Sequence, residues 1–125
     1  MQLSFTELPE DYAIIRCAAD APIPDWWDGA GLTSLTRAND ELSLICRAER
    51  VPAGQVSEAG WMALRVDTLA ELDEPGVVMA AITPISSAGL GVFVISTHLR
   101  DYLLVRKSER DKVRTILINA GHAFD

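Results

Sequence analysis

The chain has 125 residues, of which 49% are hydrophobic and 23% are charged, values typical of a globular domain rather than a disordered chain. Its formal net charge of −7 argues against a nucleic-acid partner, because binding a phosphate backbone needs a concentrated basic surface. The charge is uneven: residues 1–60 carry 4 Lys/Arg against 10 Asp/Glu, and residues 61–125 carry 7 against 8. This asymmetry predicts two units, residues 1–60 and residues 61–125.

Neither a secretory leader nor a membrane-spanning helix is expected. The first residues lack a basic stretch, and Glu7 and Glu10 interrupt any apolar run. Residues 75–99 carry no Asp, Glu, Lys or Arg, but prolines, serines and glycines divide them into a helix-like and a strand-like half. Cys17 and Cys46 belong to no C-x-x-C pair and are expected to be free buried thiols. The chain is therefore expected to be cytoplasmic.

The first half reads as short strands joined by an irregular segment. Residues 3–8 alternate weakly, and residues 12–18 are rich in β-formers. The sequence "APIPDWWDGAG" then breaks this pattern, with one helical turn expected at residues 25–28. Residues 32–37 and 41–47 flank an Ala-Asn-Asp turn, which predicts a β-hairpin.

The second half reads β-α-β-β-α after a polar connection at residues 48–60. Residues 61–67 alternate like a strand, and residues 77–88 repeat their apolar side chains at helical spacing. Two further strands are predicted at residues 92–98 and 101–107, joined by a polar turn. The order of elements is that of a known supersecondary unit, apart from its final strand.

The final helix is the clearest element of the sequence. Ser108 is expected to be its N-cap, and Gly121 its stop. In the preceding helix, Pro84 lacks the N–H that would bond the carbonyl of Ala80, so a bend is expected there. The final helix carries one apolar stripe, formed by Val113, Ile116, Leu117 and Ala120.

Residues 61–125 are one strand short of a ferredoxin-like βαββαβ unit. Residues 3–8 are the candidate for the missing fourth strand. Residues 12–60 repeat the same order of strands in eroded form. The sequence therefore predicts an α+β fold of two tandem ferredoxin-like units, a degenerate one at residues 1–60 and a fuller one at residues 61–125.

The second half resembles an ACT domain, the small βαββαβ amino-acid-binding module found in regulated enzymes such as aspartokinase. The match runs over "LDEPGVVMAAITPISSAGLGVFVISTHLRDYLLV", in which Asp73-Glu74-Pro75-Gly76 corresponds to the family's Asp-x-Pro-Gly loop. With the first-half segment "LTRANDELSLIC", the chain is similar to small bacterial proteins that hold two ACT domains, and to the ACT modules of eukaryotic cytosolic arginine sensors. The bacterial relatives often carry Thr-Gly where this chain has Pro75-Gly76.

A helix N-terminus that follows a glycine-containing loop offers unpaired backbone N–H groups to a carboxylate. Here Gly76, Val77 and Val78 would donate, because Pro75 has no N–H. The resemblance implies that the strand at residues 92–98 faces the ligand across an interface between ACT units. The candidate ligand-binding residues are Asp73, Glu74, Pro75, Gly76, Val77, Val78, Ile95, Ser96, Thr97 and Asp101.

The polar residues of the turn after residue 95 have a second interpretation. Ser96, Thr97 and Asp101 can simply satisfy backbone groups of a tight connection. Ser96, His98 and Asp101 also include the residue types of a hydrolase triad, but no nucleophile elbow surrounds them. We therefore expect no catalytic residue, and the scattered His and Cys residues predict neither a metal site nor a cofactor.

The sequence predicts a non-catalytic regulatory protein that binds a free amino acid between ACT units. Sheets of this type leave edges to cover, so a homodimer is expected, together with an unidentified protein partner that senses the ligand. No nucleic-acid or membrane partner is expected. The alternative is a ligand-free ACT module that serves only assembly.

Overall fold

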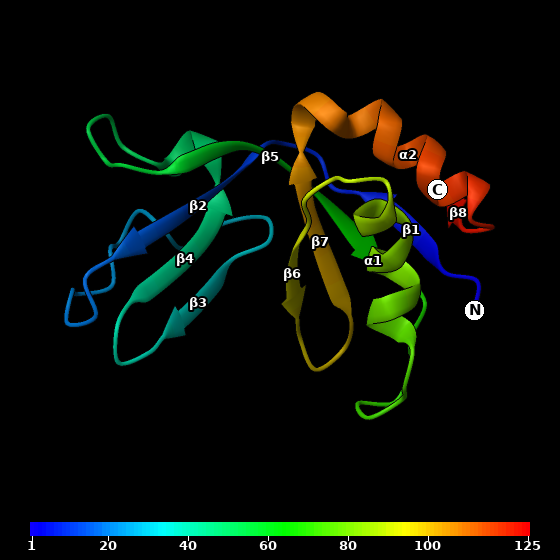
Figure 1. The fold of residues 1–125 in the computed structure, drawn as a ribbon. Helices are drawn as coiled ribbons and strands as arrows, with labels where there is room; N and C mark the ends of the chain where they lie inside the picture. The colour runs from blue at the N-terminus through cyan, green and yellow to red at the C-terminus, as the bar shows by residue number, and fades with distance from the viewer. The chain divides into compact units, whose positions relative to one another are not determined.

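A computed structural model describes all 125 residues and shows an α+β fold (Figure 1), as predicted. The chain forms two compact units, one of residues 10–61 and one of residues 1–9 with 62–125. We call the first the loop unit and the second the helical unit. The elements are β1 (Ser4–Glu7), β2 (Tyr12–Cys17), β3 (Ser34–Arg37), β4 (Leu42–Arg47), η1 (Ala48–Arg50), β5 (Glu58–Val66), α1 (Val77–Ser87), β6 (Phe93–Ser96), β7 (Asp101–Arg106), η2 (Lys107–Glu109), α2 (Arg110–Asn119) and β8 (Ala123–Phe124).

The helical unit has the strand order β6-β7-β5-β1-β8. β1 lies antiparallel to β5, with Phe5 opposite Val66, and parallel to β8. The prediction that residues 3–8 supply the fourth strand of the βαββαβ unit is therefore confirmed. The pairing follows from the apolar side chains of this segment, since Leu3 and Phe5 are both fully buried.

Side chains from the strands and both helices form the core of the helical unit. Leu64 of β5, Ile85 of α1 and Leu117 of α2 are all fully buried in one cluster. The two helices contact each other, and α2 also contacts β7 and β8. The strands alternate between this cluster and their other face, as a sheet covered by helices on one side requires.

The helices and strands of this unit follow the predicted ranges to within three residues at each end, and the start of α2 differs in kind. Residues 107–109 form a short 3-10 turn, and α2 begins only at Arg110. Glu109 is its N-cap and makes no side-chain capping bond, so the expectation that Ser108 caps the helix is wrong. Gly121, with φ of 94°, ends the helix as predicted, because a glycine adopts this left-handed conformation without strain.

The loop unit repeats the strand order of the helical unit without its helices. Its order is β3-β4-β2-β5, and the predicted hairpin of β3 and β4 is confirmed. The segment between β2 and β3 stands where the first helix of a βαββαβ unit would be, and η1 stands in place of the second. β5 begins at Glu58, earlier than predicted, because Glu58 and Trp61 pair with β2. The loop unit is thus a degenerate ferredoxin-like unit.

Two adjacent tryptophans cover the loop unit's sheet in place of a helix. Trp26 and Trp27 pack against the buried side chains of β2 and β4. The indole N–H of Trp27 donates to the carbonyls of Ser34, at 3.2 Å, and Ile45, at 3.1 Å. Residues 24–27 form a turn with a bond from the N–H of Trp27 to the carbonyl of Pro24, rather than a helix. Both cysteines are free thiols, of which Cys46 is buried and Cys17 half-buried.

Candidate functional site

The helical unit holds a pocket of about 290 Å³ at one end of its sheet. The walls come from the segment between β5 and α1, the first turn of α1, and the turn between β6 and β7. This volume lies just below the usual range for drug-sized ligands, which begins at about 300 Å³. The lining residues are Thr68, Ala70, Glu71, Leu72, Glu74, Gly76, Val77, Val78, Met79, Ser96, Thr97, His98, Leu99, Arg100 and Asp101.

The pocket brings together the two segments that the sequence analysis singled out. The predicted residues that line it are Glu74, Gly76, Val77, Val78, Ser96, Thr97 and Asp101. Three others, Asp73, Pro75 and Ile95, are not among the lining residues. Asp73 and Pro75 are exposed on the loop, whereas Ile95 is buried. Ile95 precedes Ser96 in β6, so its side chain points to the opposite face of the strand.

Hydrogen bonds between its own polar groups fix the turn between β6 and β7. The Ser96 hydroxyl donates to the Asp101 carboxylate at 2.7 Å. The Thr97 hydroxyl donates to the carbonyl of Arg100 at 2.8 Å and accepts from its N–H at 3.2 Å. These side chains therefore stabilise the turn and also line the pocket. Because Ser96 donates directly to Asp101, no histidine stands between them as a triad would require.

The first turn of α1 presents backbone N–H groups without side-chain partners. Gly76 is the N-cap, with φ of 90°, and makes no side-chain capping bond. The first turn contains no acidic residue, and the first intrahelical bond runs from the N–H of Ala80 to the carbonyl of Gly76. The positive end of the helix dipole therefore lies at the pocket, where it favours an anionic group.

A buried histidine holds α1 in place behind the pocket. Pro84 leaves the carbonyl of Ala80 without its usual helical donor. Nδ1 of His122 accepts the N–H of Leu3 at 2.9 Å, so Nε2 carries the proton and donates to Ala80 at 3.0 Å. This ring also makes a T-shaped contact with the ring of Phe5. One imidazole thus joins α1 to the strand that completes the sheet.

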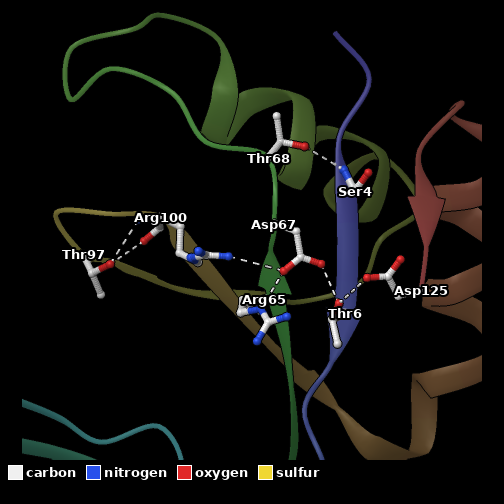
Figure 2. A network of polar contacts seen from close by, with 8 residues as sticks. All are labelled: Ser4, Thr6, Arg65, Asp67, Thr68, Thr97, Arg100 and Asp125. Carbon is white, nitrogen blue, oxygen red and sulfur yellow. Dashed lines mark hydrogen bonds and ion pairs between the residues drawn. The ribbon is translucent and has the colours of Figure 1, made fainter.

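A charged network surrounds Asp67 (Figure 2), and two residues of this network, Thr68 and Arg100, line the pocket. Asp67 accepts hydrogen bonds from Arg65 at 2.6 Å and Thr6 at 2.5 Å, and Arg100 lies 3.4 Å away. Burial alone would raise the pKa of Asp67. The bonds from Thr6 and Arg65, together with the positive charges of Arg65 and Arg100, outweigh this effect and lower the pKa. Thr68, which lines the pocket, accepts the N–H of Ser4 at 2.9 Å.

The sequence analysis missed the polar lining residues Thr68, Glu71, His98 and Arg100. Arg100 and His98 lie within the turn that was singled out, so their positions in the hairpin were a usable signal. The contact of Arg100 with Asp67 could not be predicted, because Asp67 is remote in sequence and lies beside Arg100 only in the folded sheet. The apolar lining residues Leu72, Met79 and Leu99 gave no signal that distinguishes them from core residues.

Comparison with known proteins assigns this architecture to a family. A family model of the ACT domain matches residues 56–119, and a model described as an N-terminal domain matches residues 10–54. A solved protein from Agobacterium tumefaciens is 38% identical, with a TM-score of 0.95 over 100% of this chain and 93% of that one. The chain belongs to the ACT domain family.

More distant structures share the fold. A protein from Vibrio cholerae is 19% identical with a TM-score of 0.76, over 95% of this chain and 90% of that one. The regulatory subunit of aspartate kinase from Thermus thermophilus is 9% identical with a TM-score of 0.59, over 89% of this chain and 93% of that one. No protein with a curated description matches the chain.

Two other kinds of feature are absent from the molecule. None of its helices is long and apolar enough to cross a membrane. No group of three or more His, Cys, Asp or Glu residues is placed to hold a metal ion.

Proposed function

We propose that this protein is a non-catalytic regulatory protein of the ACT type, which binds a free amino acid in the pocket of the helical unit. The observation that carries the proposal is the meeting of the α1 N-terminus with the β6–β7 turn around one pocket. The helix start suits an α-carboxylate, and the carboxylates of Glu74 and Asp101 suit an ammonium group. The similarity to an aspartate kinase regulatory subunit supports a regulatory role.

We propose further that the protein acts as a homodimer in which a second copy covers the pocket. Leu72, Met79 and Leu99 line the pocket and remain 71%, 61% and 55% exposed. Apolar side chains gathered at the mouth of a pocket favour contact with another protein surface. β6 pairs only with β7 and so leaves an edge that a second chain could also cover.

The test is thermal unfolding of the purified protein against a panel of free amino acids at millimolar concentration. A ligand at about 100 times its dissociation constant stabilises the folded state by roughly 2.7 kcal/mol, which raises the midpoint by roughly 10 °C. We expect one amino acid to produce this shift. Asp101→Ala should abolish it, whereas Asp73→Ala, in the segment between β5 and α1 but outside the pocket lining, should retain it.

The exposed apolar side chains also favour a second candidate, a ligand-free ACT module that serves only assembly. In that case no amino acid shifts the midpoint. The response to amino acids therefore separates the two candidates. Sedimentation of wild type against Met79→Ser then tests the assembly role, because the loss of an exposed apolar contact would weaken self-association.

A further inference from the structure

Building on the proposed function, we propose that Arg100 is a specificity-determining residue of the pocket, whose guanidinium exchanges Asp67 for an anionic group of the ligand. The expected ligand is a small zwitterion that carries a carboxylate. The carboxylate of the ligand is bound by a side chain of the β6–β7 turn as well as by backbone N–H groups.

Arg100 has unused hydrogen-bond donors and is accessible to a ligand in the pocket. It lines the pocket, and its side chain is 18% exposed. A guanidinium offers five N–H donors in a planar fork. The contact of Arg100 with Asp67 is a single approach of Nη1 to Oδ1 at 3.4 Å, which is long for a charge-assisted bond. Most of its donor capacity is therefore available to a carboxylate.

Asp67 does not depend on Arg100. Arg65 donates to the same oxygen at 2.6 Å, and Thr6 donates to the other at 2.5 Å. If Arg100 turns to a ligand, Asp67 keeps both of these shorter bonds. The exchange therefore leaves no buried charge unpaired, which is the usual cost of breaking an ion pair.

The remaining charges of the pocket favour a zwitterion over a simple anion. Glu71, Glu74 and Asp101 line the same pocket as Arg100. They repel a purely anionic molecule but attract an ammonium group placed opposite its carboxylate. Arg100 is thus the basic side chain of the lining that can bind the carboxylate end of the ligand.

The test uses acetate as the carboxylate probe and methylammonium as the amine probe, followed by NMR of the arginine side-chain Nε–H groups and the pocket amides. Acetate is expected to shift the Nε–H resonance of Arg100 more than that of Arg65, which bonds Asp67 but does not line the pocket. Methylammonium is expected to leave Arg100 unchanged. Equal shifts at both arginines, or none at Arg100, would overturn the inference.

Matched variants give the second arm. Arg100→Gln should weaken acetate binding roughly 10- to 100-fold, the range expected for loss of a hydrogen bond to a charged group. The acetate affinity of Arg100→Lys should lie between those of wild type and Arg100→Gln, because lysine keeps the positive charge but lacks the planar guanidinium. Arg65→Gln should change acetate binding less than about threefold, within the spread of context effects. If Arg65→Gln does not fold, the comparison of the Arg100 and Arg65 Nε–H shifts in the wild-type protein tests the inference by itself.

The two proposals fail in different ways. If an amino acid raises the unfolding midpoint and Arg100→Gln binds it as tightly as wild type, the Arg100 inference is wrong and the proposed function stands. If acetate engages Arg100 but no amino acid shifts the midpoint, Arg100 is confirmed as a carboxylate receptor and the amino-acid function fails.

Discussion

The two units share a strand order but cover their sheets differently, and only one builds the pocket described here. In the helical unit, α1 and α2 bury the sheet, and the N-terminus of α1 opens onto the pocket. In the loop unit, a segment bearing Trp26 and Trp27 covers the corresponding face. In the helical unit the cover also brings a helix start to the pocket, where the helix dipole favours an anionic group. The loop unit thus keeps the strand order and an apolar cover, but has no α-helix whose start could line a pocket.

The loop unit compensates for its lost helices with bonds from arginines and aromatic side chains to backbone groups. Arg50 donates to the carbonyls of Trp27 and Ala30, and the Tyr12 hydroxyl accepts the N–H of Leu32 at 3.1 Å. These bonds satisfy polar groups that a helix would satisfy internally. The comparison predicts that the loop unit is sensitive to single side chains, and the helical unit to the contacts that hold α1.

The largest effect is expected from Trp27→Ala, which removes the cover of the loop unit's sheet. The variant loses apolar burial and leaves the carbonyls of Ser34 and Ile45 without their indole donor. We expect a loss of about 3 kcal/mol in the free energy of unfolding, measured with urea. Trp27→Phe, which keeps a ring but no N–H, should lose less than half of this. Equal losses would mean that the indole N–H decides the stability.

A smaller effect is expected from Gly31→Ala in the same loop. Its φ is +88°, and an added Cβ would lie 2.6 Å from Nε of Arg47 and 2.9 Å from the Tyr12 hydroxyl. Gly54 is a matched control, since its φ is +92° and an added Cβ would meet nothing within 4 Å. Both variants lose about 1 kcal/mol of unfolding free energy to backbone strain. Gly31→Ala should lose about 1 kcal/mol more, because its Cβ clashes with neighbouring side chains. A smaller or absent difference in urea unfolding would show that the loop adjusts freely.

The helical unit is tested through His122 and Pro84. His122→Phe leaves the carbonyl of Ala80 and the N–H of Leu3 without partners, so we expect a loss of about 2 kcal/mol. Pro84→Ala supplies a new helical donor for Ala80. In that background His122→Phe should cost about 1 kcal/mol less, as a double-mutant cycle would measure. Additive losses would contradict the link between the proline and the histidine.

The smallest effect concerns the acid sensitivity of Asp67. Its pKa is lowered in the folded state, so the folded protein binds fewer protons than the unfolded chain. The resulting stability is fully present above the unfolded pKa of about 3.9 and is lost as the pH falls through the lower folded value. Asp67→Asn should therefore cost about 1 kcal/mol at pH 7 and almost nothing near pH 2. Asp73→Asn, exposed on its loop, should cost little at either pH.

Local patterns predicted the elements well, and the contacts between distant residues poorly. The hairpin of β3 and β4, helix α1 and the completing strand β1 all follow from periodicity and turn residues. Ser108 failed as a cap because a 3-10 turn at residues 107–109 delays the helix. A polar residue can cap a helix only if the helix begins directly after it. The residue at which a helix begins after a strand is not determined by local propensity.

The candidate site shows the same division. The loop before α1 and the β6–β7 turn were identified from residue types and a family resemblance, and the fold brings them to one pocket. Alternation along β6 would have excluded Ile95, whose neighbour Ser96 lines the pocket instead. Arg100 and His122 acquire their roles from Asp67, Ala80 and Leu3, which only the folded chain places beside them.

The origin of the fourth strand has a consequence for biosynthesis. Phe5 pairs with Val66, so residues 1–9 are synthesised before their partner strand, and their apolar side chains stay exposed until β5 has emerged. Such long-range closure slows folding and leaves an aggregation-prone strand uncovered in the meantime.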